Sequence, residues 1–200
     1  MKRNPLTCIL ISLLAVTLTS LPTQSENLID DSALKAEAIS IVKQFGSTLK
    51  PLLKEAIATG GLDHAIDVCS TQAPQIARQL GEKSGWSVKR VSLKPRSDLR
   101  ASADLFEKEV LQQFDRRQQD GEPLDTMAYA ERTATEFRFM KAQGTDGLCL
   151  NCHGKSISSE VKNALNRYYP NDLATGYSLG QVRGAFSLTK KLHSNGPNQQ

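Results

Sequence analysis

An amphipathic region spanning residues 30–85 dominates the first half of the chain. In its first part, apolar residues recur at steps of three and four, as on one face of a helix: Leu34, Ala38, Ile41, Phe45, Leu49, Leu52 and Ala56. Gly60 and Gly61 are expected to end this helix, and Asp63 is suited to cap a second one that runs to residue 85. Pro51 is expected to kink or divide the first helix.

The rest of the chain mixes short strand patterns with further helices. Strands are predicted over residues 86–94, around Phe137 and Phe139, and over residues 181–192; helices are predicted over residues 102–121 and 158–169. The helix over 102–121 takes Ser102 as its N-cap. This order of elements predicts an α+β fold, in which helices pack on one side and at the N-terminal end of a small antiparallel sheet.

Composition indicates a single globular domain. The chain has 200 residues, of which 39% are hydrophobic and 23% charged. Its net charge is only +4, and its basic residues form no cluster, so nucleic acid is not an expected partner. We predict one domain over residues 26–192 and a disordered tail over residues 193–200.

The N-terminus reads MKRNPLTCILISLLAVTLTSLPTQSEN, a basic start followed by a short apolar run and small polar residues. This order is typical of a secretory signal peptide, and the run is too short for a membrane span. We predict a signal peptide over residues 1–25 and an exported protein that does not span the membrane after cleavage. Cleavage removes Cys8 and leaves Cys69, Cys149 and Cys152.

Cys149, Cys152 and His153 form a C-x-x-C-H motif within GTDGLCLNCHGKS. This motif is typical of c-type haem attachment, because the two thiols reach the two vinyl groups on one porphyrin edge and the histidine ligates the iron. We therefore predict one covalent haem c. A structural zinc needs a fourth protein ligand, and a thioredoxin-like redox pair needs a βαβ context; both remain as lesser alternatives.

A sixth iron position would then need a ligand. The candidates are water, or no ligand, or a side chain from among Cys69, His64, His193, Met127 and Met140. Cys69 lies on the apolar stripe of the second helix, where Pro74 is expected to bend the chain beside it. From the residues alone, Cys69 is equally an iron ligand or a small buried apolar group.

Four stretches together resemble a known family: AIDVCSTQAPQIA (65–77), RVSLKPRSDLRASADLFEKEVLQQF (90–114), FRFMKAQGTDGLCLNCHG (137–154) and YYPNDLATGYSLGQVRGAFSL (168–188). The family is a group of exported c-type haem proteins with cyanobacterial members, long catalogued as a domain of unknown function. The same domain serves as the extracytoplasmic input of some sensor kinases and cyclases. The likeness covers roughly residues 30–190.

The resemblance implies a PAS-like fold, a sheet flanked by helices, that holds one haem between His153 and Cys69. A thiolate opposite histidine favours ferric iron and so a low potential. We expect a redox or small-gas sensor or a redox mediator, located in the periplasm or the thylakoid lumen. An electron-carrier cytochrome c is the alternative and a haem peroxidase a lesser one; no acid/base group accompanies the motif, so an enzyme is not expected.

Arginines are the natural partners of the two haem propionates, because guanidinium matches carboxylate bidentately. The sequence offers Arg90, Arg96, Arg100 and Arg183, of which Arg183 and Arg96 are our chosen candidates. We expect no output domain within this sequence, and we therefore expect the partner to be a separate redox or signalling protein. The N-terminal helix allows either a monomer or a homodimer.

Overall fold

The computed structural model describes residues 30–192. The predicted signal peptide over residues 1–25, the tail over residues 193–200 and His193 lie outside the described residues. Within residues 30–192, no helix combines the length and the apolar character needed to cross a membrane.

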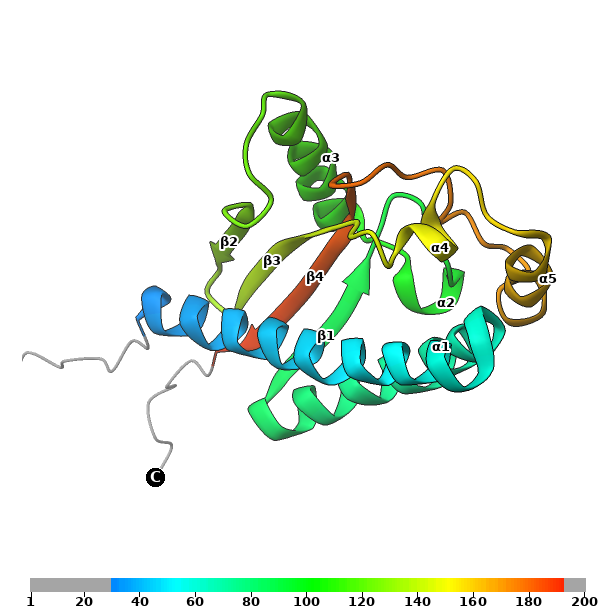
Figure 1. Ribbon diagram of the computed structural model, residues 1–200. Helices are drawn as coiled ribbons and strands as arrows, with labels where there is room; N and C mark the ends of the chain where they lie inside the picture. Colours follow the sequence, from blue (N-terminus) through cyan, green and yellow to red (C-terminus); the bar gives the residue numbers. More distant parts are fainter. Residues whose placement is uncertain (1–29, 193–200) are drawn as a thin grey trace, which may run out of the picture.

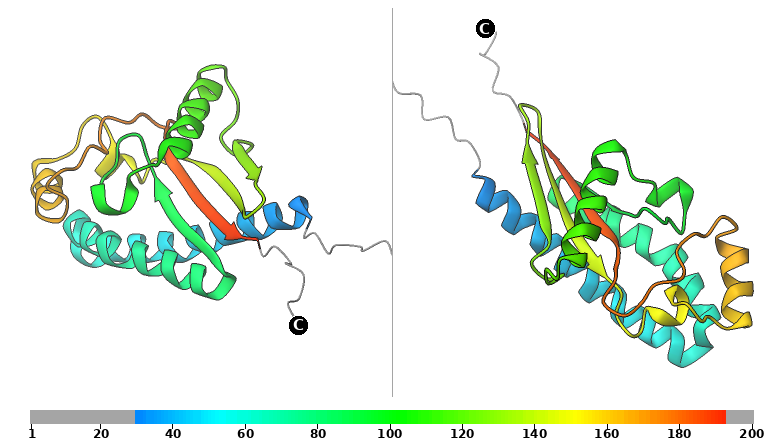
Figure 2. Two further views of the ribbon diagram at one scale, coloured as in Figure 1. Left: turned by 180° about the vertical axis from the view of Figure 1, so that it is seen from behind. Right: turned by 90° about the horizontal axis from the view of Figure 1, so that it is seen from above.

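Helix α1 (Asp31–Ser84) is a hairpin of two helical segments that lie side by side in opposite directions (Figures 1 and 2). The break is at Gly60 and Gly61, as predicted. Gly61 has φ 71° and ψ −166°, a conformation that glycine adopts without steric cost. Pro51, which was expected to kink or divide the helix, does not divide it, since the backbone stays helical there. Asp63, predicted as a cap, pairs with Arg167 of the later helix α5.

Four antiparallel strands form one sheet in the order β1-β4-β3-β2. They are β1 (Trp86–Val91), β2 (Ala128–Arg132), β3 (Glu136–Gly144) and β4 (Val182–Lys191). Three correspond to the predicted strands. β2 was not predicted individually; it is a partly buried edge strand, so the apolar alternation that marks a half-buried strand is weak in its sequence, AYAER.

The α1 hairpin covers one face of the sheet (Figure 2). Apolar side chains from both of its segments and from three strands form the core on this face, among them Phe45, Ile76, Trp86, Phe137, Phe139, Phe186 and Leu188. The predicted stripe on residues 34–56 is therefore a buried face. Its burial against the sheet stabilises both elements, because apolar area removed from water contributes about 25 cal/mol per Å².

Helix α3 (Leu105–Gln119) covers the opposite face of the sheet, where Met127 and Met140 are fully buried. The helix begins two residues later than predicted, with Asp104 as its N-cap. Asp104 and Glu107 form a capping box, in which each side chain bonds the backbone amide of the other. Ser102, predicted as the N-cap, instead follows the short helix α2 (Asp98–Ala101) as its C-cap.

Three shorter segments gather at the end of the sheet where the α1 hairpin turns back (Figure 1). They are α2, α4 (Leu150–His153) and α5 (Ser159–Tyr168), the last matching the predicted helix over 158–169. Val161, Ala164 and Leu165 of α5 pack on Ile66 of α1 in a separate apolar cluster. The predicted α+β architecture is thus confirmed, and the C-x-x-C-H motif lies at this end of the sheet.

Candidate functional site

Cys149, Cys152 and His153 lie on one helical turn. β3 ends at Gly144, and the chain then bends into α4. The amides of Cys152 and His153 donate to the carbonyl of Cys149 at 3.1 and 2.8 Å, which closes the turn. Residues three apart on a helix are neighbours, and both cysteines line the same cavity. Both thiols are free of disulfide bonds.

Gly154 completes this turn, and its backbone packs closely against that of Leu150. Its amide donates to the carbonyl of Leu150 at 2.9 Å. A Cβ at position 154 would lie 2.5 Å from that carbonyl oxygen, closer than real contacts allow. The tight turn therefore requires glycine directly after the motif, a constraint that sequence reasoning missed although GLCLNCHG contains it.

His153 is held in one orientation by the loop that follows α5. Its Nδ1 lies 2.7 Å from the carbonyl oxygen of Ala174, and because a carbonyl only accepts, Nδ1 must carry the proton. The lone pair is then on Nε2, which has no hydrogen-bond partner within residues 30–192. Burial, and then the charges of Arg96 and Arg183, lower the pKa of His153 well below its usual value. A neutral imidazole of this tautomer is the form that ligates metals.

Arg96 joins the motif to the same loop. Its Nη2 donates to the carbonyl of Cys152 at 2.6 Å, and its Nε and Nη2 donate to the Asp172 carboxylate at 3.2 and 3.1 Å. The two side chains are only 11% and 7% exposed. Asp172 also accepts from the amide of Ala174 at 2.8 Å, whose carbonyl orients His153. One buried ion pair thus positions both the cysteine turn and the acceptor for the histidine.

Arg183 reaches the site because β4 carries a bulge. Gln143 pairs with Gly184 and Gly144 with Val182, which leaves Arg183 without a partner in the register. Regular alternation along the strand would place Val182 on the same face as Phe186, but because of the bulge Val182 packs on the α3 face.

The Arg183 guanidinium forms hydrogen bonds with other residues of the protein. Nη1 donates to Ser92 Oγ at 2.9 Å, and Nε lies 3.1 Å from His153 Nδ1. Because Nδ1–H is directed at Ala174, Arg183 acts on His153 as a neighbouring charge and not as a hydrogen-bond donor. Burial lowers the pKa of Arg183 to about 10, so it stays charged at neutral pH.

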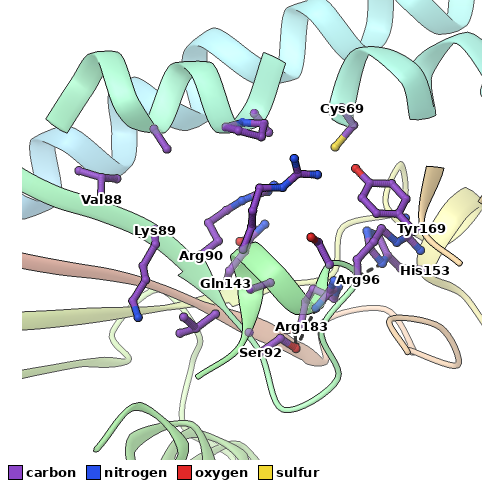
Figure 3. Close-up of a pocket in the computed structure, with 18 of the residues that line it drawn as sticks. Cys69, Val88, Lys89, Arg90, Ser92, Arg96, Gln143, His153, Tyr169 and Arg183 are labelled. Atoms are coloured by element: carbon purple, nitrogen blue, oxygen red, sulfur yellow. Dashed lines mark hydrogen bonds between the residues drawn. The ribbon is translucent and has the colours of Figure 1, made fainter. Parts of the chain in front are cut away.

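Cys69 reaches the same space from the second segment of α1. Two cavities of about 510 and 340 Å³ share the lining residues Cys69, Arg90, Arg96, Gln143, His153 and Tyr169. Figure 3 shows the sulfur of Cys69 entering this pocket from α1, with the Tyr169 hydroxyl pointing toward it. Cys149 and Cys152 line the larger cavity only, together with apolar residues of α1.

The other candidate ligands lie elsewhere. Met127 and Met140 are on the opposite face of the sheet, and His64 is exposed and lines neither cavity. Within the described residues, no cluster of three or more histidine, cysteine, aspartate or glutamate side chains is arranged to hold a metal ion by itself. Cys69 and His153 are therefore the candidates that share a cavity with the two motif cysteines.

This donor set fits the predicted haem c. Two free thiols lie on one turn, a neutral imidazole has an unengaged Nε2, and a half-buried thiol lines the same cavity. The larger cavity is within the range of cofactor pockets and is lined mainly by apolar side chains. The sequence analysis did not identify Ala174, which accepts from His153, Asp172, which pairs with Arg96, or Tyr169, which lies near Cys69. None of these roles is marked by a sequence motif.

Comparisons with known proteins bear on the family and the fold. A family model described as Tll0287-like: Tll0287 matches residues 22–190. The crystal structure of the cyanobacterial haem protein Tll0287 is similar in fold, with a TM-score of 0.62 at 20% sequence identity, over 84% of this chain and 99% of that one. No curated protein matches the chain.

Proposed function

The chain belongs to the Tll0287-like family, and on that premise we propose that it binds a single haem c, attached through Cys149 and Cys152 and ligated by His153 and Cys69. The observation that carries the proposal is the convergence of these four side chains on one pair of adjoining cavities from two distant parts of the chain. The similar cyanobacterial structure is itself a haem protein.

The haem would supply one-electron redox chemistry. The protein's part is to hold and tune it. Ala174 fixes the imidazole orientation, and its hydrogen bond strengthens His153 as a ligand. The Cys69 sulfur donates electron density, which favours ferric iron and lowers the potential. The apolar lining from α1 excludes water from the larger cavity.

We assign the protein a role as a redox or small-gas sensor or a redox mediator. Cys69 lies on the second segment of α1, which packs along the sheet and meets the first segment at the Gly60–Gly61 break. A change at Cys69 therefore acts directly on a long helix that a separate signalling or redox protein can contact. An exported location, in the periplasm or thylakoid lumen, and a monomeric or homodimeric state belong to the same proposal.

The test of the cofactor is mass spectrometry under denaturing conditions. The mature protein, purified from cells able to attach haem c, should carry the mass of one haem, and Cys149→Ser with Cys152→Ser should remove it. A mature N-terminus near residue 25, recovered from the periplasmic fraction, tests export. Polypeptide mass alone in the wild type would refute the proposal.

The test of the ligands is an absorption and EPR comparison of wild type with Cys69→Ser. We expect a low-spin thiolate signature that the variant loses. Ser70→Ala, at the next position on the same helix, is the matched control and should keep it. An electron carrier with methionine ligation would instead show a positive midpoint potential and an unchanged spectrum in Cys69→Ser.

The test of sensing is hydrogen exchange of ferric and ferrous protein. A sensor should change protection in residues 62–84 on reduction, and Cys69→Ser should abolish that change. A mediator should show no difference between the two redox states.

A further inference from the structure

The smaller cavity carries an excess of positive charge. Its charged lining residues are Arg78, Lys89, Arg90, Arg96, Arg100 and Arg183. No aspartate or glutamate of the described chain is among the residues that line it. A charge held away from water without a counter-ion is costly, so this cavity is suited to an anion.

Most of these charges are already engaged or lie at the surface. Lys89 binds the buried carboxylate of Glu107, and Arg96 binds Asp172. Arg183 donates to Ser92 Oγ and to the carbonyl of Lys94. Arg78 and Arg100 are exposed.

Arg90 is different. It lies on β1 opposite Phe186 and is half-buried. Its guanidinium lies 5.0 Å from the ring centroid of Phe45, and within residues 30–192 it has no ion pair or side-chain hydrogen bond. Figure 3 shows Arg90 in the pocket between β1 and α1. It lines both cavities, so it stands where the two meet.

The positions of the motif cysteines indicate how a bound haem would be oriented across the two cavities. The carboxylates of haem are on the edge opposite its vinyl groups. Cys149 and Cys152, which would bond the vinyl groups, line the larger cavity and not the smaller one. The carboxylate edge would thereby be directed away from these cysteines, and the arginine-lined cavity is the adjoining space that would match its charge.

We propose, resting on the haem function above, that Arg90 binds a haem propionate, whereas Arg96 and Arg183, the arginines chosen from the sequence, position the C-x-x-C-H turn and His153. A guanidinium that has no ion pair or side-chain hydrogen bond within residues 30–192 is free to bond a carboxylate bidentately. Arg96 and Arg183 direct their donors at Cys152, Asp172 and Ser92, and are positioning residues.

The experiment compares Arg90→Gln and Arg90→Lys in the haem-loaded full chain with Arg116→Gln. Arg116 is an exposed residue of α3 on the other face of the sheet, so its variant makes the same charge change away from the pocket. Arg90→Gln should shift the propionate bending band in the resonance Raman spectrum and lower the midpoint potential, because removing a cation favours ferric iron. Arg90→Lys should retain most of the potential, and Arg116→Gln should change neither signal.

The outcome that overturns the inference is an Arg90→Gln protein whose Raman band and potential match those of Arg116→Gln. A propionate band that shifts in Arg183→Gln and not in Arg90→Gln would overturn it as well. If Arg90→Gln attaches no haem, Arg90→Lys is compared with Arg116→Gln by the Raman band alone. A lysine keeps the charge but cannot bond a carboxylate bidentately, so the band should still shift, and an unchanged band would overturn the inference. Failure of the haem proposal is distinct, because the wild-type protein would then lack the haem mass.

Discussion

Arg96 of the loop after β1 donates a 2.6 Å hydrogen bond to the carbonyl of Cys152, in the turn before α5. Fifty-six positions separate the two residues. The same guanidinium holds Asp172 in the loop after α5, so three segments distant in sequence converge on one cation. This relationship makes the cysteine turn part of the folded core of the site.

Replacement of Arg96 by alanine should therefore destabilise the protein strongly. Breaking a buried pair leaves an uncompensated charge on Asp172, at a cost of about 3–5 kcal/mol. Urea unfolding of Arg96→Ala, Asp172→Asn and the double variant checks this, and the double variant should lose less than the sum of the two. Additive losses would contradict the pairing. Haem attachment measured by mass should fall in Arg96→Ala.

Gly154→Ala should disturb the turn that carries the motif. Its Cβ would meet the Leu150 carbonyl at 2.5 Å, which forces the backbone to shift at a cost of about 1–3 kcal/mol. We expect a lower midpoint of thermal unfolding and less attached haem. Gly147→Ala is the control, since a Cβ there meets nothing within 4 Å. Equal behaviour of the two variants would argue against the close contact.

Glu107 should contribute to stability and not to the haem site. Its fully buried carboxylate binds Lys89, the hydroxyl of Ser187 at 2.6 Å and the amide of Asp104 at 2.9 Å. Glu107→Ala leaves these groups unpaired, and we expect a loss of about 3–5 kcal/mol in the free energy of unfolding. Glu107 lines neither cavity, so the absorption spectrum of the folded, haem-loaded variant should match wild type. A changed spectrum would show that Lys89, released from Glu107, acts on the pocket.

Tyr169→Phe should lower the midpoint potential. Burial raises the pKa of Tyr169 to about 12, so its hydroxyl keeps its proton, and it points toward Cys69 in Figure 3. A hydroxyl dipole directed at the sulfur would reduce the electron density that the sulfur donates, so removing the hydroxyl should favour ferric iron. Potentiometric titration measures the shift. Tyr168→Phe, at the exposed neighbouring position, is the control, and a shift of the same size there would remove the role of Tyr169.

Much of the fold could be predicted from local patterns in the sequence. The helical stripe on residues 34–56 and the break at Gly60 and Gly61 are properties of neighbouring residues, and the structure confirms both. The start of α3 was misplaced at Ser102, because Asp104 and Glu107 satisfy two backbone amides reciprocally and so form the better cap. Pro51 did not divide α1, since packing of the helix on the sheet outweighs the loss of one hydrogen bond.

The chemistry of the motif was likewise readable in Cys149, Cys152 and His153, because their spacing alone defines it. The residues that surround the motif could not be predicted from the sequence. The bulge that turns Arg183 toward His153 depends on the register between β3 and β4, and Arg96 meets Cys152 only when three loops come together. The sequence by itself determined the longer helices, three of the four strands and the reactive groups, since these depend on residues close together along the chain. The tertiary structure decided how Cys69, which the family resemblance implied, comes to share a cavity with His153, and that Arg90 has no counter-ion among residues 30–192, because both depend on how distant segments pack.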